Sequence, residues 1–385
     1  MKSRARPRVA PFKDGAFTSP LHSPRIAALL GIALGITFTV CFLTGVLSHL
    51  VQQPPSWFTW PSRPAGLYRV TQGLHVATGI IAIPLLLGKL WTVYPRLWQW
   101  PPIENPTHLV ERISLAPLVA GSVFLLFTGI ANISLWYPWR FFFPAGHYGA
   151  SWITMGALIV HVGAKAAIVR RELWRRDPAA LQVTLNGGLS RRGFLGVIAG
   201  TAGILTLTTI GQTFSPLNRL AVLAPRRPDI GPQGFPVNKS AFSANVLESA
   251  RDPGYRLRVT GRVERELDLS LDELRALPQH RATLPISCVE GWSATVDWEG
   301  IRALELLALA GASPGHSVQV ESLQPDGLYR TSVLNPVHAD DLDTLLALRC
   351  NGGALHIDHG YPLRLIGPNR PGVMQTKWVS ELIVL

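Results

Sequence analysis

The sequence predicts a membrane-embedded α-helical bundle followed by an α+β domain. Up to residue 214 it contains five apolar stretches of about 20 residues, the length that an α-helix needs to cross a hydrocarbon core of about 30 Å. After residue 235 the pattern changes to short alternating runs and short helical runs, typical of strands and helices around one core. Apolar residues make up 47% of the 385 residues and charged residues only 16%, which also favours a part that lies in lipid.

The positive charge of the chain is concentrated in its apolar half. Residues 1–214 carry 19 Lys and Arg against 5 Asp and Glu, a net charge of +14, whereas residues 215–385 carry 17 against 19, a net charge of −2. A nucleic-acid-binding protein would hold such an excess on a polar folded domain, but here it lies between apolar runs. We therefore expect membrane lipid as the partner of these residues, and no nucleic acid.

The predicted spans and their basic flanks define a topology. The spans run approximately over residues 26–50, 68–91, 113–136, 148–169 and 194–214. Sixteen Lys and Arg flank them on the side of the N-terminal basic tail, residues 1–25, whereas only Arg63, Arg69 and Arg140 lie on the other side. The positive-inside rule then predicts a multi-pass protein of the cell membrane with a cytoplasmic N-terminus, a four-helix membrane domain over residues 26–170, and an extracytoplasmic C-terminal domain.

The fifth stretch differs from the other four. It is rich in Gly and Thr, and it follows the sequence SRRGFL at residues 190–195. This motif resembles the twin-arginine export signal, which serves proteins that cross the membrane folded. An ordinary positively charged flank is the alternative interpretation. We expect residues 190–214 to form a signal-anchor helix.

The C-terminal region is predicted to form an α+β domain over residues 236–385, after a Pro-rich linker over residues 215–235. Its expected elements are strands over 255–263, 362–366 and 377–385, short helices over 271–277 and 303–310, and a hairpin over 318–333 around the turn sequence Pro-Asp-Gly.

One cysteine of this domain has a setting suited to metal binding. Cys288 follows a strand-like run and opens the sequence CVEGWS, whose glycine indicates a turn. A thiolate at such a strand end can project into a cleft. Packing as a small buried hydrophobe, and a disulfide with Cys350, are alternatives that the cysteine pattern leaves open.

Three segments carry a family resemblance. CVEGWSATVDWEG, NGGALHIDHGYPLRLIGP and PGVMQTKWV together resemble the catalytic domain of the sulfite oxidase family, including its bacterial methionine sulfoxide reductase branch. The resemblance implies a molybdenum-molybdopterin cofactor with Cys288 as the protein ligand of molybdenum, a soft thiolate beside the two dithiolene sulfurs. The cofactor-binding residues that it implies are Asn238, Lys239, Ser322, His359, Arg364, Gln375, Thr376 and Lys377.

The sequence also departs from the sulfite-oxidising members. Those members carry an Arg three residues before the lysine of the last motif, where this chain has Met374, and an immunoglobulin-like dimerisation domain is not expected after that motif. We therefore expect oxygen-atom transfer on a small S-oxide, N-oxide or similar molecule, with Tyr329 and Arg330 as candidates for its pocket. Sulfite oxidation and a metal-free membrane-anchored binding module are the alternatives.

Histidines in the membrane half suggest a second redox centre. His147 and His161 are 14 residues apart on one predicted span, which places them on roughly the same helix face about 21 Å apart. The arrangement resembles the dihaem four-helix cytochrome b subunits of formate dehydrogenases and nickel hydrogenases. That resemblance implies one or two b haems, with His75 and His147 as one ligand pair and His22 and His161 as the other. It also implies quinone or another redox protein as the electron partner.

Two further histidines compete for these places. His49 competes with His75 and His108 with His22, and interfacial histidines that bind no metal are a further alternative.

Overall fold

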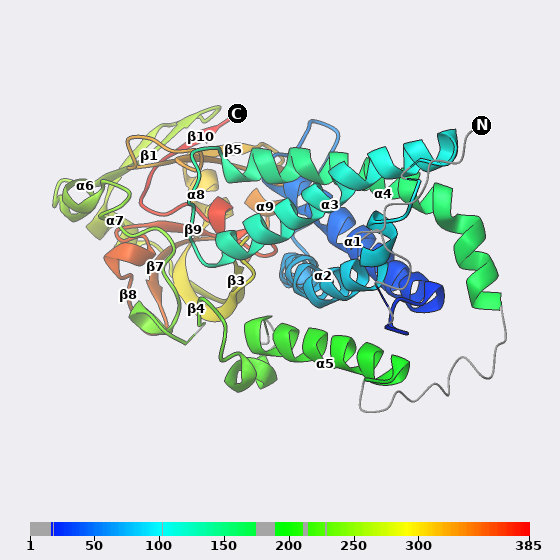
Figure 1. Ribbon diagram of the computed structural model, residues 1–385. Helices are drawn as coiled ribbons and strands as arrows, with labels where there is room; N and C mark the ends of the chain where they lie inside the picture. The colour runs from blue at the N-terminus through cyan, green and yellow to red at the C-terminus, as the bar shows by residue number, and fades with distance from the viewer. Residues whose placement is uncertain (1–16, 18, 102, 175–188, 211–214, 228) are drawn as a thin grey trace. The chain divides into compact units, whose positions relative to one another are not determined.

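The computed structural model describes residues 17, 19–101, 103–174, 189–210, 215–227 and 229–385, which divide into two compact units (Figure 1). The first unit contains the residues up to Val46 and Leu74–Thr209. The second combines Leu47–Gly73 with Ile210–Leu385. Most of the predicted basic tail, and residues 175–188 of the predicted cytoplasmic connection, lie outside the described residues.

Long apolar helices dominate the N-terminal half. They are α1 (Pro24–Gln52), α2 (Leu67–Leu97), α3 (Pro106–Ile133), α4 (Phe143–Trp174) and α5 (Arg191–Ile210). The most apolar stretches of these five helices have mean hydropathies between 1.6 and 2.5, and each helix is long enough to cross a membrane. The prediction of an apolar helical region followed by an α+β domain is therefore confirmed, whereas orientation and the number of helices that cross stay predictions.

Two close helix contacts in the first unit depend on glycine. At Gly88 of α2 a Cβ atom would lie 2.3 Å from Cδ1 of Ile198 on α5, and at Gly121 of α3 it would lie 2.2 Å from Oγ1 of Thr154 on α4. Ile198 is buried together with residues of α1 and α2, such as Leu30. The helix that follows the double arginine therefore packs against the bundle.

The C-terminal domain is built on two five-stranded sheets (Figure 1). The first has the order β2-β1-β10-β5-β6, and the second has the order β3-β4-β7-β8 with β9 paired to β7. The strands are β1 (Arg256–Gly261), β2 (Leu267–Ser270), β3 (His280–Ser287), β4 (Ser293–Arg302), β5 (Val318–Ser322), β6 (Thr331–Leu334), β7 (Leu345–Cys350), β8 (Gly353–Ala354), β9 (Arg364–Ile366) and β10 (Val379–Val384).

Short helices and alternating burial complete this domain. The short α-helices are α6 (Leu247–Arg251), α7 (Leu271–Ala276), α8 (Ala303–Leu309) and α9 (Pro336–Ala339). In β1, Leu257 and Val259 are fully buried while their neighbours are more exposed, because successive side chains of a strand point to opposite faces. The predicted helices at 271–277 and 303–310 and the hairpin at 318–333 are confirmed as α7, α8 and the β5–β6 pair.

Candidate active site

The second unit contains a cavity of about 190 Å³ that gathers most of the predicted site residues. Its wall comes from the segment before α6, the β3–β4 turn, the loop before β6, the start of β9 and the stretch before β10. The lining residues are Phe235, Pro236, Asn238, Lys239, Ile286, Cys288, Trp292, Gln324, Leu328, Tyr329, His359, Arg364, Gly372, Val373, Gln375, Thr376, Lys377 and Trp378.

Cys288 is held at the end of β3 by a tight turn. Its backbone N–H donates to the Trp292 carbonyl at 2.9 Å and its carbonyl accepts from Gly291 N–H at 3.1 Å. Gly291 has a φ of 91°, a conformation that favours glycine. The side chain is 4% exposed, and Sγ accepts a hydrogen bond of 2.7 Å from Asn238 Nδ2. The turn therefore presents one buried sulfur atom to the cavity.

The electrostatic surroundings of this sulfur suit a metal ion. Burial, and after it the Glu290 carboxylate, raises the pKa of the Cys288 thiol above its usual range. Burial also raises the pKa of Glu290 to about 7. A positive ion bound to Sγ would reverse this effect, because a coordinating thiol loses its proton to the metal.

Several cations line the cavity. Arg364 is 2% exposed, donates from Nη1 to the His359 carbonyl at 2.9 Å, and has a buried Nε with no hydrogen-bond partner. Lys377 Nζ donates only to carbonyls, those of Asp358 at 2.6 Å and Lys239 at 2.9 Å. Among the described residues, no carboxylate forms an ion pair with Arg364, Lys239 or Lys377.

Burial makes these charges costly. It lowers the pKa of Arg364 to about 10 and, together with Arg364, lowers the pKa of Lys377 well below its usual value. A buried charge without a partner is expensive, so this set of donors fits an anionic ligand such as a phosphate group.

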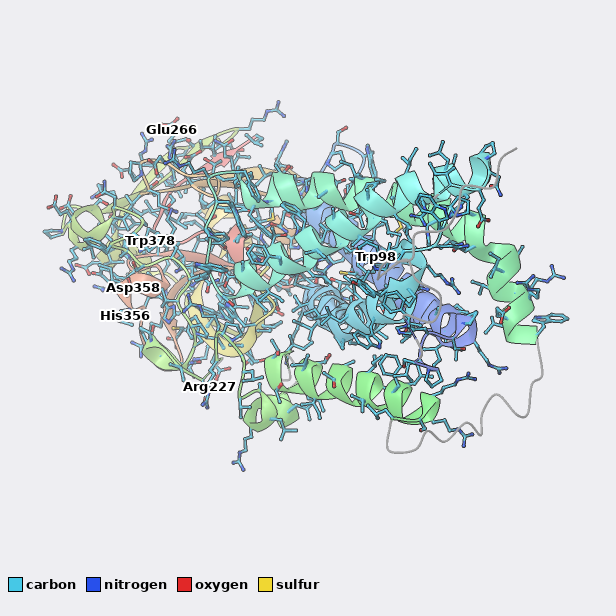
Figure 2. All side chains as sticks on the ribbon, in the orientation of Figure 1. Trp98, Arg227, Glu266, His356, Asp358 and Trp378 are labelled. Atoms are coloured by element: carbon cyan, nitrogen blue, oxygen red, sulfur yellow. The ribbon has the colours of Figure 1, made fainter. Side chains whose placement is uncertain are left out.

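Aromatic rings and neutral groups fix the cationic side of the cavity. The His359 ring stacks on Phe235 with a centroid distance of 3.7 Å, and the Arg364 guanidinium lies 5.4 Å from the centre of the Trp298 ring. Burial, and after it Arg364, lowers the pKa of His359 to about 3, so this imidazole is neutral near pH 7. Trp378, labelled with Asp358 in Figure 2, donates from Nε1 to the Ile357 carbonyl at 2.8 Å and so joins two segments of the wall.

Comparison with known proteins agrees with this arrangement. Residues 244–385 match the family model of the oxidoreductase molybdopterin-binding domain. The C-terminal domain belongs to this family.

Three relatives are similar to parts of this chain. A protein assigned as the protein-methionine-sulfoxide reductase subunit YedZ1 of Azospira oryzae is 30% identical over 174 residues, which cover 45% of this chain and 64% of the relative. The NADH nitrate reductase of Ulva prolifera is 30% identical, over 34% of this chain and 18% of its own length. The mitochondrial sulfite oxidase of Mus musculus is 31% identical, over 34% of this chain and 29% of its own length. The match spans less than two thirds of each relative. At the level of the domain, the expectation of a molybdopterin-binding oxidoreductase is confirmed.

Nine of the predicted residues line the cavity of the molybdopterin-binding domain, and two do not. The nine are Cys288, Tyr329, Asn238, Lys239, His359, Arg364, Gln375, Thr376 and Lys377. Arg330, expected in the substrate pocket, instead forms an ion pair of 3.0 Å with Glu321. Ser322 does not line the cavity. Its hydroxyl donates at 2.8 Å to the carbonyl of Lys377, which does line it. The alternative disulfide does not form, since Cys288 and Cys350 are both free.

Several lining residues were not predicted. Gln324 accepts a short hydrogen bond from Lys239 Nζ, and Phe235 and Trp378 form aromatic parts of the wall. Gln324 lies two residues after Ser322 in the β5–β6 connection, and connections between strands often carry binding residues. Phe235 falls in the Pro-rich segment that we predicted as linker, where no sequence signal indicated a binding role.

The first unit brings one of the two predicted histidine pairs together. The rings of His75 on α2 and His147 on α4 lie 6.4 Å apart between centroids. His75 Nδ1 lies 2.8 Å from the Cys41 carbonyl and His147 Nδ1 lies 3.0 Å from the Thr128 hydroxyl, so Nε2 is the nitrogen left for a metal in each ring. A side chain at position 45 would crowd the His75 ring, because a Cβ atom on Gly45 would lie 2.9 Å from its Cε1.

The other candidate histidines have different surroundings. His22 Nδ1 lies 3.3 Å from the Thr92 carbonyl, and its ring is 5.9 Å from that of Trp91. His161 lies on α4. His108, the alternative to His22, accepts from Arg112 Nε at 3.2 Å.

Proposed function

We propose that the chain is a membrane-bound molybdopterin-dependent oxidoreductase that transfers an oxygen atom to or from a small extracytoplasmic substrate, such as an S-oxide or N-oxide. The observation that carries the proposal is one cavity whose wall holds the buried Cys288 sulfur together with Arg364, Lys239 and Lys377, cations that form no ion pair among the described residues. These two features meet the two needs of a molybdopterin, a ligand for its metal and counter-charges for its phosphate.

Each residue has a task in this proposal. Cys288 Sγ would bind molybdenum, while Arg364 and Lys377 would bind the phosphate of the pterin. The bound cofactor supplies two-electron oxygen-atom transfer. Asn238 orients the sulfur through its Nδ2 hydrogen bond and is itself held by Trp292 Nε1 at 3.1 Å. Tyr329, whose pKa burial raises, keeps a neutral hydroxyl in the cavity wall, where it could contact the substrate.

Met374 favours an S-oxide or N-oxide over sulfite. Its side chain is apolar and 9% exposed, in the position where the sulfite-oxidising members carry an arginine. A dianion such as sulfite would lose that counter-charge. The metal-free binding module is less well supported, because a binding module has no need of a buried thiol beside unpaired cations.

We propose that the membrane half carries b haem and passes electrons between the molybdenum site and quinone or another redox protein. The support is the His75 and His147 pair, since ring centroids 6.4 Å apart leave room for one metal ion at bonds of about 2 Å to each ring. We further propose a second haem between His22 and His161.

We also propose that the C-terminal domain is exported by the twin-arginine route and lies outside the cell membrane. Replacing Arg191 and Arg192 by Lys should trap residues 225–385 in the cytoplasm while the first four helices still insert, because the twin-arginine route requires the arginine pair. Protease added outside then no longer cleaves the domain. Unchanged cleavage would show that the motif is an ordinary basic flank.

The decisive experiment for the enzyme is a pair of cysteine variants. Cys288→Ala should abolish turnover of S- or N-oxides with a reduced dye while the purified protein keeps its pterin, because the phosphate-binding cations are unchanged. The matched control is Cys350→Ala, since Cys350 is equally buried in the same domain but does not line the cavity. Full activity of Cys288→Ala, or absence of molybdenum and pterin from the wild-type protein, would refute the proposal.

A further inference from the structure

The end of α1, the start of α2 and the segment that joins them belong structurally to the molybdopterin-binding domain. Leu47–Gly73 forms one compact unit with the C-terminal residues. Asn369 of the domain is 1% exposed and all its polar groups contact this segment. Its carbonyl accepts from Trp60 Nε1 at 2.8 Å and its N–H donates to the Ala65 carbonyl at 3.1 Å. Its Nδ2 donates to the Pro61 carbonyl at 2.7 Å and its Oδ1 accepts from Tyr68 N–H at 2.6 Å.

A chain of hydrogen bonds leads from this segment to Tyr329 in the cavity wall and to Val289, the neighbour of Cys288. At one end the Tyr329 hydroxyl, in the cavity wall, lies 3.0 Å from Oε1 of Gln52. Gln52 Nε2 lies 3.1 Å from both the carbonyl and the hydroxyl of Ser48. The Ser48 hydroxyl donates to Gln72 Oε1 at 3.0 Å, and Gln72 Nε2 donates to the carbonyl of Val289 at 2.6 Å. Val289 directly follows Cys288.

The partners of Gln52 determine the direction of its bond to Tyr329. The Ser48 carbonyl can only accept, so the amide nitrogen of Gln52 must face it and the amide oxygen must face Tyr329. That oxygen can only accept, so Tyr329 donates. The single hydroxyl proton of Tyr329 is thus committed to Gln52, and its ring is fixed in the cavity wall.

We propose that Gln52 is a positioning residue for the substrate, so that the last residue of α1 contributes to substrate binding in the molybdopterin-binding domain. The inference rests on the proposed function. Gln52 does not line the cavity and acts through Tyr329. Without the Gln52 side-chain oxygen, the Tyr329 hydroxyl has lost its acceptor. The Tyr329 ring then shifts, or its hydroxyl proton turns toward the cavity.

The experiment compares Gln52→Leu, Tyr329→Phe and the double variant in the full-length holoenzyme. The probes are dimethyl sulfoxide, reduced with a viologen dye, and sulfite, oxidised with an acceptor dye. We expect Gln52→Leu to raise KM about 3- to 10-fold, the effect of one hydrogen bond, with kcat within about twofold. Tyr329→Phe should do the same, and the double variant should be no worse than the more affected single variant.

Controls separate positioning from general destabilisation. Gln52→Glu keeps an acceptor for Tyr329 and should restore most of the affinity. Gln53→Leu changes the exposed neighbour and should have the wild-type KM. An unchanged KM in Gln52→Leu, or a double variant whose effect is the product of the two single effects, would overturn the inference.

A second readout does not need turnover. Gln52→Leu should increase hydrogen–deuterium exchange in residues 328–334, whereas Gln53→Leu should not. If the wild-type protein turns over neither probe, the proposed function fails while this exchange still decides the inference, and unchanged exchange in Gln52→Leu overturns it.

Discussion

Replacing Arg364 by methionine should have opposite effects on the cofactor-free and the cofactor-loaded protein. Burial lowers the pKa of Arg364 well below its usual value, to about 10. A base whose pKa is depressed on folding destabilises the folded state at every pH below its folded pKa, so the cost is fully present at pH 7. The shift corresponds to about 3 kcal/mol of unfavourable free energy. Methionine is of similar length and carries no charge.

The cofactor-free variant should therefore be more stable than the cofactor-free wild-type protein. The substitution also loses the hydrogen bond to the His359 carbonyl, worth about 1 kcal/mol, so the net gain is about 2 kcal/mol. For a domain of this size such a gain raises the Tm by about 4–8 °C. Scanning calorimetry on protein from cells unable to make the pterin measures it.

The cofactor-loaded protein should respond in the other direction. Loss of one charge-assisted hydrogen bond to the phosphate, about 1.5–3 kcal/mol, weakens cofactor binding roughly 10- to 150-fold. Pterin content after gel filtration measures this loss. Arg370→Met is the matched control. Arg370 is equally buried, but it donates to the Val333 and Met374 carbonyls outside the cavity lining, so its loss should leave pterin content unchanged. A cofactor-free Arg364→Met protein less stable than wild type, with normal pterin content, would refute the reasoning.

Two more predictions concern the helices of the first unit. His147→Ala and His161→Ala should each remove one component of the low-spin haem absorbance and spare the other, because positions 14 residues apart on a helix lie about 21 Å apart and one porphyrin cannot contact both. A purified wild-type protein without haem absorbance would contradict this. Gly88→Leu should destabilise the bundle by about 1–3 kcal/mol, because its side chain would overlap Ile198, whereas Gly35→Leu, where no other atom lies within 4 Å, should not. Thermal unfolding in detergent compares the two, and equal midpoints would contradict the packing of α5.

The sequence predicted well what depends on local pattern. The β5–β6 hairpin follows from alternating residues around a Pro-Asp-Gly turn, and the place of Cys288 follows from a strand that ends before a glycine. The choice of both Tyr329 and Arg330 for the pocket was only half right. Both residues lie in the turn before β6, where the Arg330 N–H donates to the Gly327 carbonyl at 3.0 Å, and only Tyr329 lines the cavity while Arg330 contacts Glu321.

The contacts that the sequence did not predict connect residues far apart in the chain. Trp60 Nε1, for example, donates to the carbonyl of Asn369, 309 positions later. Gln52 and Gln72 sit at helix ends where glutamine is unremarkable. A local pattern states whether a residue is apolar or polar, but it does not identify the partner, which only the tertiary fold brings close.

The central place of β10 has a consequence for how the protein matures. This last strand runs parallel to β1, with Arg258 opposite Glu381, and also pairs with β5. The first sheet therefore has a gap in its middle until the ribosome has synthesised residues 379–384, and Lys377 cannot reach the cavity before then. Such long-range pairing folds slowly, because the loop between the strands must close first. A chain that stops before residue 377 would lack both Lys377 and the central strand of this sheet, so it would offer the pterin no finished site.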